Sequence, residues 1–498
     1  MTVTANPSFP PWLEWEFLQE GYEIENPNVE QPLPGDPQLV KIWRNDEYKI
    51  EAEIYGQPKS FAVDARKNDN AGKIVPASSI KGENPRGVKY ELTGFISGDS
   101  EVQHQYIGGQ EKESFKSTLT LHEVKITQQQ NVPVERLTEW YINGISAHFI
   151  LFRSTSRRIN KKYSLEREVL KSKTEEFEMK GGASHSRDYA FINCDEFSFI
   201  IHTVPSQFGP EWSKNIGIEY RQEFGRIPTQ EERVAISEIV SFVLGKHLLK
   251  VGYTAYDRSG IPIEKVAVNP WGDNVKHLCQ SPALPPFEID RLEPTGKIEA
   301  ILPPLIKKYF ELRDPLRLNE VLWRYWIGSE LSLGSNIPIM ANGIEILIES
   351  WFKSQNSRLK GVYLPKGEFD ALTDEGFKII DANLGDRPYK EKIMNKLKDC
   401  FKMSLTDQLK FFFEEIGLPL GTTEQKAIRC RHKMIHSSVE MGSEKIEEVV
   451  RLSFAYRCLV HRTILKILGY QGSYTDYATI GHPETSIDCP VGESANKT

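Results

Sequence analysis

The spacing of hydrophobic residues changes near the middle of the chain and predicts two regions of different fold. From about residue 47 to 290, apolar side chains mostly recur at every second position or form short continuous runs. Alternation is typical of strands with one buried face, and continuous apolar runs are typical of fully buried strands. We therefore predict a β-rich region. Strands are expected at residues 48–54, 88–92, 115–126, 147–152, 197–204 and 248–255.

One helix is predicted inside this β-rich region. Thr229 and Glu232 have the spacing of a capping box, in which each side chain accepts a hydrogen bond from the other residue's backbone N–H. Gly245 marks the end of the helix, because glycine readily adopts the left-handed conformation found there. We expect one face of the helix to be buried, and it carries Ile236, Val240 and Leu244.

Beyond a proline-rich stretch at residues 280–286, which has the composition of a domain linker, the period becomes helical. We therefore predict an α+β protein. Residues 1–290 form a β-rich domain, either one unit or two subdomains split near residue 145, and residues 296–470 form an all-α bundle. Residues 484–498 are polar and are expected to be a flexible tail. Helices are predicted at residues 314–332, 337–354, 367–382, 389–416, 423–438 and 443–468.

The last of these helices has the clearest signal. Ser443 can serve as its N-cap, and Gly469 lies just beyond its end. We expect one stripe of its residues to face the core, and this stripe consists of Ile446, Val449, Ser453, Val460, Ile464 and Ile467.

Composition narrows the class of protein without identifying it. The 498 residues are 39% hydrophobic and 26% charged, which is typical of globular proteins, and the formal net charge is −7. A nucleic-acid partner would therefore have to meet a local basic patch. The six cysteines are scattered without CxxC spacing, and we recognise neither a signal peptide nor a membrane span. A cytoplasmic protein without membrane contact is expected.

The strongest candidate for chemistry is the helix predicted at residues 423–438. Cations and imidazoles crowd its second half, and like charges this close are unfavourable unless an anion binds among them. A phosphate suits both residue types, because arginine grips it with a planar fork and histidine moves protons near neutral pH. The alternative is a solvated helix end, where basic side chains suit the negative end of the dipole. The residues concerned are Arg429, Arg431, His432, Lys433 and His436.

Two of these residues have the chemistry that RNA cleavage without a metal requires. One group must take the proton of the 2′-hydroxyl, another must protonate the departing 5′-oxygen, and a cation must stabilise the phosphorane. His436 is the candidate acid or base, Arg431 is the candidate cation, and His432 lies one turn before His436. Positions five apart on an ideal helix are splayed by roughly 140°. The pair therefore needs a distorted helix or a second copy of the chain.

The segment from Arg431 to His436 resembles the R-x4-6-H motif of the HEPN superfamily. A polar residue follows the arginine in that motif, and His432 stands where many members have asparagine. Arg429 also fits the motif, with a longer spacing to His436. The order of two amphipathic helices, the motif and a long last helix is similar to the ApeA-like branch, whose N-terminal domain the β-rich region also resembles. The two amphipathic helices lie at residues 316–326 and 344–349.

The resemblance implies a prokaryotic antiviral effector that acts by abortive infection and cuts RNA, often tRNA, without a metal or other cofactor. Two HEPN domains would pair, in a homodimer or larger homo-oligomer, to form one composite site. Arg431, His436 and His432 would be catalytic, and Arg429 and Lys433 would bind RNA. The β-rich domain would be a regulatory or sensor domain, with a phage-derived protein as the trigger. The alternative is a non-catalytic HEPN-type module that binds RNA or nucleotides as a sensor or scaffold.

Other features carry separate predictions. The basic run at residues 153–163 is either a site for RNA or an acidic phage protein, or a solvated loop, and residues 171–182 are expected to form a mobile loop. Glu345 either orients Arg431 or is an ordinary surface carboxylate. His461 either lines the same groove as the motif or, as we expect, is an ordinary surface histidine. Core or dimer-interface positions are expected for three aromatic residues, Trp323, Tyr325 and Trp326.

Overall fold

A computed structural model gives the fold of the chain. It describes residues 15–18, 21–25, 27–29, 35–58, 79–94, 96–107, 110–129, 131–145, 154–159, 162–167, 174–178, 189–204, 209–270, 275–289, 297–354, 360–436 and 443–493. Some side chains within these ranges fall outside the description, among them those of residues 96–113, 154–178 and 432–436.

The chain forms two compact units. The β-rich unit comprises Met1–Arg233, Leu244–Leu284 and Ile289–Pro303, and the helical unit comprises Val234–Val243, Pro285–Glu288 and Pro304–Thr498. Residues 234–243 and 285–288 of the predicted first domain therefore belong to the helical unit, and residues 296–303 of the predicted bundle belong to the β-rich unit. No division falls near residue 145.

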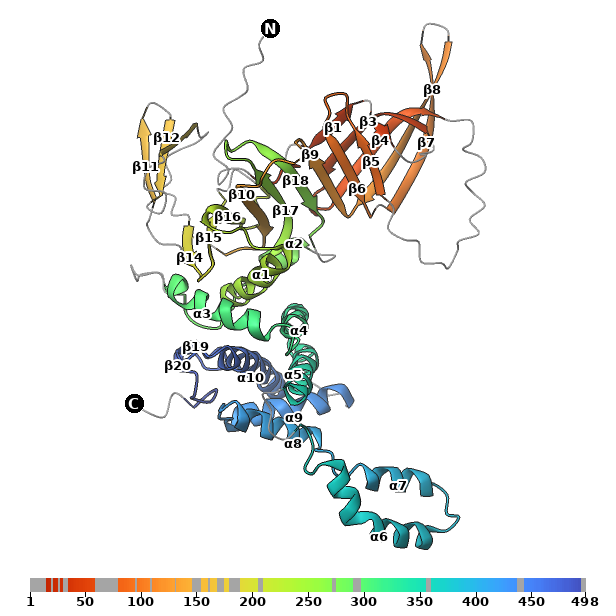
Figure 1. Ribbon diagram of the computed structural model, residues 1–498, viewed down its shortest axis with the longest axis vertical. Helices are drawn as coiled ribbons and strands as arrows, with labels where there is room; N and C mark the ends of the chain where they lie inside the picture. The colour runs from red at the N-terminus through yellow and green to blue at the C-terminus, as the bar shows by residue number, and fades with distance from the viewer. Residues whose placement is uncertain are drawn as a thin grey trace. The chain divides into compact units, whose positions relative to one another are not determined.

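Two large antiparallel sheets dominate the described part of the β-rich unit (Figure 1). One has the strand order β1-β3-β4-β8-β7, and the other has the order β14-β15-β16-β10-β17-β18-β9-β6-β5-β2. The second sheet takes strands from both sides of residue 145, which explains why the chain is not divided there. The strands of the first sheet are β1 (Tyr22–Glu25), β3 (Gly35–Arg44), β4 (Ile50–Pro58), β7 (Ile96–Ile107) and β8 (Gln110–Leu121). Those of the second are β2 (Asn28–Val29), β5 (Ser79–Glu83), β6 (Lys89–Thr93), β9 (Glu123–Thr127), β10 (Arg136–Ile142), β14 (Tyr189–Asn193), β15 (Phe197–Thr203), β16 (Ile216–Gly225), β17 (Leu249–Tyr256) and β18 (Pro262–Val268).

The predicted alternation of apolar residues places them in a shared core. Ile50, Ala52 and Ile54 of β4 pack in one cluster with Leu92 of β6 and Val124 of β9, and each is at most 2% exposed. The five-stranded sheet therefore packs on one part of the ten-stranded sheet. Burial of every second side chain from each sheet supplies the hydrophobic stabilisation.

Two stretches predicted as loops contain strands instead. β11 (Ser154–Ile159) lies in the basic run and pairs with β12 (Lys162–Arg167), which begins in the run and ends beyond it, and β13 (Thr174–Glu178) pairs with β12. The loop predictions were therefore wrong for these strands, because antiparallel backbone pairing orders them despite their charge. Their side chains and the strand predicted at residues 147–152 lie outside the described residues, so a binding role for the run stays a prediction.

Helix α1 (Gln230–Leu244) forms where it was predicted, and both of its predicted caps are confirmed. The Thr229 N–H donates to the Glu232 carboxylate at 2.7 Å, and the Glu232 N–H donates to Thr229 Oγ1 at 3.3 Å. Gly245 has a φ of 64°, the left-handed conformation expected at this end. The predicted stripe of three apolar residues on this helix is 0% exposed. The short helix α2 (Val275–Gln280) was not predicted.

In the helical unit, α4, α5, α9 and α10 pack together (Figure 1). Close approach of α4 and α5 depends on glycine, because a Cβ at Gly328 would lie 2.8 Å from Met340 Cγ. Helix α3 was not predicted, because Pro303 and Pro304 lie within it and proline is disfavoured inside a helix. The elements of this part of the chain are α3 (Lys297–Leu312), α4 (Leu318–Glu330), α5 (Asn336–Lys353), α6 (Lys366–Leu384), α7 (Lys390–Lys398), α8 (Leu405–Glu415), α9 (Thr422–His436), α10 (Ser443–Ile467), β19 (Ser473–Thr475) and β20 (Glu484–Ser486).

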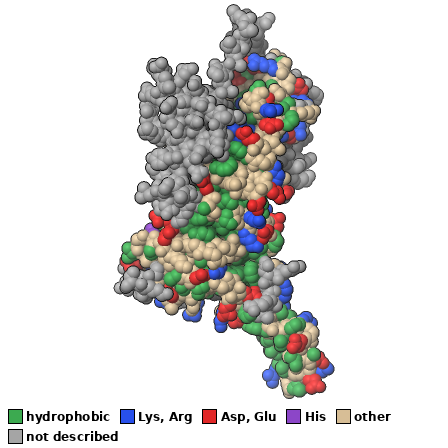
Figure 2. Space-filling model, turned by 60° about the vertical axis from the view of Figure 1, so that its left-hand side comes forward, with side chains coloured by type: hydrophobic (Ala, Val, Ile, Leu, Met, Phe, Trp, Pro, Cys, Tyr) green, Lys and Arg blue, Asp and Glu red, His purple; other side chains and the backbone are tan. Residues whose placement is uncertain are grey.

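The single helix predicted at residues 389–416 is two helices, α7 and α8. The break follows from Ser404, whose Oγ accepts a 3.2 Å hydrogen bond from the Asp407 N–H and so caps α8. Helices α6 and α7 form a hairpin that extends from the rest of the helical unit (Figure 1). Apolar side chains are visible on its surface (Figure 2), and Leu372 and Tyr389 are 71% and 72% exposed.

The C-terminal segment corrects one prediction and supports another. Residues 484–493 are not a free tail, because β20 pairs with β19 and Ile487 and Val491 are 0% exposed. The predicted stripe of α10 faces the core, except for Ile446 at its start, which is 46% exposed. Among the described residues, no helix is both long enough and apolar enough to cross a membrane.

Candidate functional site

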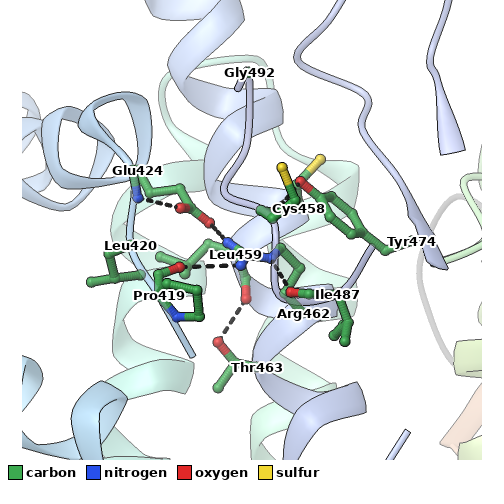
Figure 3. Close-up of polar contacts among 12 residues, drawn as sticks. Pro419, Leu420, Glu424, Cys458, Leu459, Arg462, Thr463, Tyr474, Ile487 and Gly492 are labelled. Carbon is green, nitrogen blue, oxygen red and sulfur yellow. Dashed lines mark hydrogen bonds and ion pairs between the residues drawn. The ribbon is translucent and has the colours of Figure 1, made fainter. Parts of the chain in front are cut away.

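The start of helix α9 is fixed by a fully enclosed ion pair between Glu424 and Arg462 of α10 (Figure 3). Both side chains are 0% exposed. The Gly421 N–H donates a 2.9 Å hydrogen bond to Glu424, so this carboxylate also caps the helix. Arg462 donates further hydrogen bonds to the carbonyl oxygens of Pro419 and Ile487, at 3.1 and 3.0 Å. Arg462 therefore ties α9, the loop before it and the C-terminal segment together.

Arg431 lies on the buried side of the same helix, where its guanidinium forms an ion pair with Glu345 of α5. The Arg431 side chain is 6% exposed, whereas that of Glu345 is 35% exposed. The predicted contact between these residues is therefore confirmed, and the interpretation of Glu345 as an ordinary surface carboxylate is wrong. A solvated helix end is likewise the wrong description of Arg431, although it suits Arg429, which is exposed.

The remaining predicted residues follow Arg431 on the helix. The backbone is helical as far as His436, but the side chains of His432, Lys433 and His436 lie outside the described residues. An unbroken helix splays Arg431 and His436 by roughly 140°. The helical backbone shows no break between these two positions, and the pairing with a second copy of the chain stays a prediction. The roles of these side chains stay predictions.

Tyr456 of α10 is a polar group near the ion pair that the sequence did not reveal. Its side chain is 0% exposed, and its hydroxyl has no hydrogen-bond partner among the residues that the structure describes. Burial raises the pKa of Tyr456, the charge of Arg431 opposes this rise and the charge of Glu345 adds to it. In the sequence, Tyr456 looks like any core aromatic of a long helix, so no local pattern could single it out.

His461 is a core residue, so its prediction as a surface histidine was wrong. It is 0% exposed, and its Nε2 lies 2.7 Å from the hydroxyl of Tyr325 on α4. Burial and the nearby charge of Arg457 hold the pKa of His461 well below its usual range. Tyr325 and Trp326 are buried as well, at 1% and 7% exposure, which confirms the core interpretation for these two aromatics. His461 thus contacts a core residue of α4, and among the described residues no contact joins it to Arg431.

A cavity of about 700 Å³ lies between α8 and α9 and reaches Arg431. Lys410, Arg429 and Arg431 contribute three cations to its lining, and Glu414 contributes one carboxylate. Lys410 Nζ lies 4.0 Å from this carboxylate, and Arg431 pairs with Glu345, so the charge of Arg429 is the one that these two acids do not offset. The site can therefore attract an anion that also carries an apolar group. The apolar part of the wall consists of Leu409, Phe413, Leu418, Pro419, Leu420 and Ile428.

No protein-family model, curated protein or solved structure matches the chain. The HEPN resemblance therefore stays a prediction that rests on the residues quoted for it. Within the part of the chain that the structure describes, no group of three or more His, Cys, Asp or Glu side chains is placed to hold a metal ion.

Proposed function

We propose that this protein is a metal-independent RNA endonuclease and that its helical unit is an HEPN-type nuclease domain. The observation that carries the proposal is the placement of Arg431. Its side chain is 6% exposed and pairs with Glu345, and the residue also lines the largely apolar cavity between α8 and α9. A cation fixed in advance by a carboxylate can stabilise charge that develops on a phosphate without reorganising during the reaction.

In the proposed reaction, the 2′-hydroxyl of one nucleotide attacks the adjacent phosphorus and loses its proton to a histidine. A second proton donor protonates the 5′-oxygen as the bond between phosphorus and that oxygen breaks. His436 and His432 supply these groups, and Arg431 stabilises the phosphorane. The products carry a 2′,3′-cyclic phosphate and a 5′-hydroxyl. Arg429 and Lys433 bind the phosphates on either side.

A second copy of the chain completes this site. Because positions 431 and 436 lie roughly 140° apart around an ideal helix, the proposed arrangement pairs Arg431 of one chain with His436 of another across a two-fold axis. We further propose that tRNA is the substrate, that cleavage halts phage growth by abortive infection, and that the β-rich unit senses a phage-derived protein.

The test is cleavage of total tRNA by the purified full chain in EDTA. Wild type is expected to give fragments with 2′,3′-cyclic phosphate ends, and Arg431→Ala/His436→Ala is expected to give none. Lys426→Ala is the matched control, because Lys426 is an exposed cation of the same helix that does not line the cavity. Fragments from the double variant would show that the assignment is wrong.

The same assay tests the alternative of a binding module. Retention of tRNA without fragments, by wild type and Lys426→Ala alike, would favour a non-catalytic RNA-binding domain. An enzyme that is held inactive until infection is recognised by expressing wild type and the double variant in phage-infected cells. Sequencing the ends of cellular RNA then shows whether new cyclic-phosphate ends depend on Arg431 and His436.

A further inference from the structure

The cavity between α8 and α9 has two chemically different parts. Its interior is apolar, and two of its side chains, Leu409 and Phe413, are only 5% and 2% exposed. Its cations are placed differently, because Lys410 and Arg429 are exposed to solvent. An occupant must therefore combine a flat or compact apolar group with negative charge outside it.

We propose that this cavity binds one nucleobase of the RNA strand, next to the phosphate that Arg431 contacts. A nucleobase has apolar faces that pack on aliphatic and aromatic side chains, and the phosphates attached to its ribose are anionic. A cavity of about 700 Å³ lies within the range of small-molecule sites and is large enough for a nucleotide. The inference rests on the proposed function for the identity of the strand.

Two observations favour RNA over an acidic peptide as the occupant. The cavity is continuous with Arg431, so a base inside it and a phosphate at the guanidinium can belong to neighbouring nucleotides. Phe413 is also among the lining residues, so the lining includes an aromatic side chain against which a base can pack. The consequence is sequence preference. A cavity of fixed shape next to the scissile bond accepts some bases better than others, so cleavage occurs after or before a restricted set of nucleotides.

The first test measures binding by the full chain, without any cleavage. The probes are the four ribonucleoside 5′-monophosphates, ribose 5-phosphate and a short acidic peptide, each titrated by calorimetry. At least one nucleotide is expected to bind ten-fold more tightly than ribose 5-phosphate or the peptide. Ile428→Trp fills the cavity and is expected to abolish this difference, whereas Lys426→Trp on the same helix is expected to keep it. Equal binding of nucleotide, sugar phosphate and peptide would overturn the inference.

A second variant guards against misfolding of Ile428→Trp. Arg429→Glu replaces an exposed cation of the lining, so it leaves the core intact, and it is expected to weaken nucleotide binding at least ten-fold. Unchanged binding by this variant counts against the inference.

The second test sequences the cleavage sites that each variant leaves in an RNA pool. Wild type and Lys426→Trp are expected to show the same base preference at one position beside the cut, and Ile428→Trp is expected to lose it. If the protein cuts RNA with a preference that Ile428→Trp does not alter, the cavity assignment fails and the nuclease proposal survives. If it never cuts but binds nucleotides in a manner that depends on Ile428, the nuclease proposal fails and the cavity assignment survives.

Discussion

Helix α9 carries two ion pairs that differ in how completely the protein encloses them. Glu424 and Arg462 are both 0% exposed, and Arg462 also donates to two backbone carbonyl oxygens. Arg431 is nearly as buried, but its partner Glu345 is 35% exposed, and Arg431 also lines a cavity. One helix therefore has a closed pair near its start and an accessible pair near its end.

This difference in exposure suggests different roles: a structural role for the closed pair and a functional role for the accessible pair. Burying an ion pair costs desolvation energy, and the attraction between the two charges only partly offsets that cost. A closed pair therefore adds little to stability. Its main effect is to favour the one packing of the helices in which the two charges meet. Consistent with this cost, burial raises the pKa of Glu424 although Arg462 lies against it. An accessible pair can exchange part of its contact for a ligand's phosphate. Breaking each pair in turn should reveal this difference.

The largest effect is expected from the closed pair. Arg462→Met leaves the Glu424 carboxylate buried without its cation, and we expect the free energy of unfolding to fall by ~3–5 kcal/mol. Urea denaturation of the helical unit, followed by circular dichroism, measures the change. Arg451→Met, at an exposed position of the same helix, is the control and should change it by less than ~0.5 kcal/mol. A loss for Arg462→Met as small as that of the control would show that the closed pair does not specify the fold.

At the accessible pair, the effect should appear in cleavage more than in stability. Glu345→Gln keeps a hydrogen-bond acceptor but removes the charge that positions Arg431, and we expect kcat for RNA cleavage to fall ~10–100-fold with little change in KM. Stability should fall by only ~1 kcal/mol, because Glu345 is partly open to water.

Glu349→Gln is the matched control for this change. Glu349 lies one turn further along α5 and pairs with Lys353 on the surface. Equal losses of kcat in both variants, or a loss of stability that accounts for the loss of activity, would show that Glu345 does not position Arg431.

Local features of the fold could be predicted from the sequence, and contacts between distant segments mostly could not. Alternating residues in β4 and the caps of α1 depend on neighbours within a few positions, and both were recognised. The long helix predicted at residues 389–416 is interrupted because the Ser404 side chain caps the start of α8. A serine can either continue a helix or cap a new one, and the sequence alone does not show which of the two is more stable. The pairing of Arg431 with Glu345 could be offered only as one of two interpretations.

His461 shows why burial that depends on distant residues could not be predicted from the sequence. Charged neighbours in the sequence suggested a surface position, but its contacts come from Tyr325 on α4 and from Phe242, residues far away along the chain. Whether a helix position faces water depends on which elements cover that face. The sequence of one helix does not contain this information.

Burial of His461 predicts a dependence of stability on pH. Its pKa is well below the usual value in the folded protein, whereas in the unfolded chain a histidine titrates near about 6.5. The unfolded state therefore binds the proton more readily, so stability is full above pH ~6.5 and falls as the pH decreases below it, by up to about 1.4 kcal/mol per pH unit. His461→Gln should remove this part of the slope in urea denaturation between pH 5 and 8, and the exposed His482→Asn should not. Identical slopes for wild type and His461→Gln would contradict the prediction.

The smallest effect is expected from Tyr456→Phe. This variant tests whether the Tyr456 hydroxyl near the accessible pair lacks a hydrogen-bond partner. Because the hydroxyl has no hydrogen-bond partner among the described residues, its removal should change the free energy of unfolding by less than ~0.5 kcal/mol or raise it slightly. A stability loss above ~1 kcal/mol would show that the chain already satisfies Tyr456. The accessible pair would then resemble the closed one, with its polar groups satisfied from within the protein.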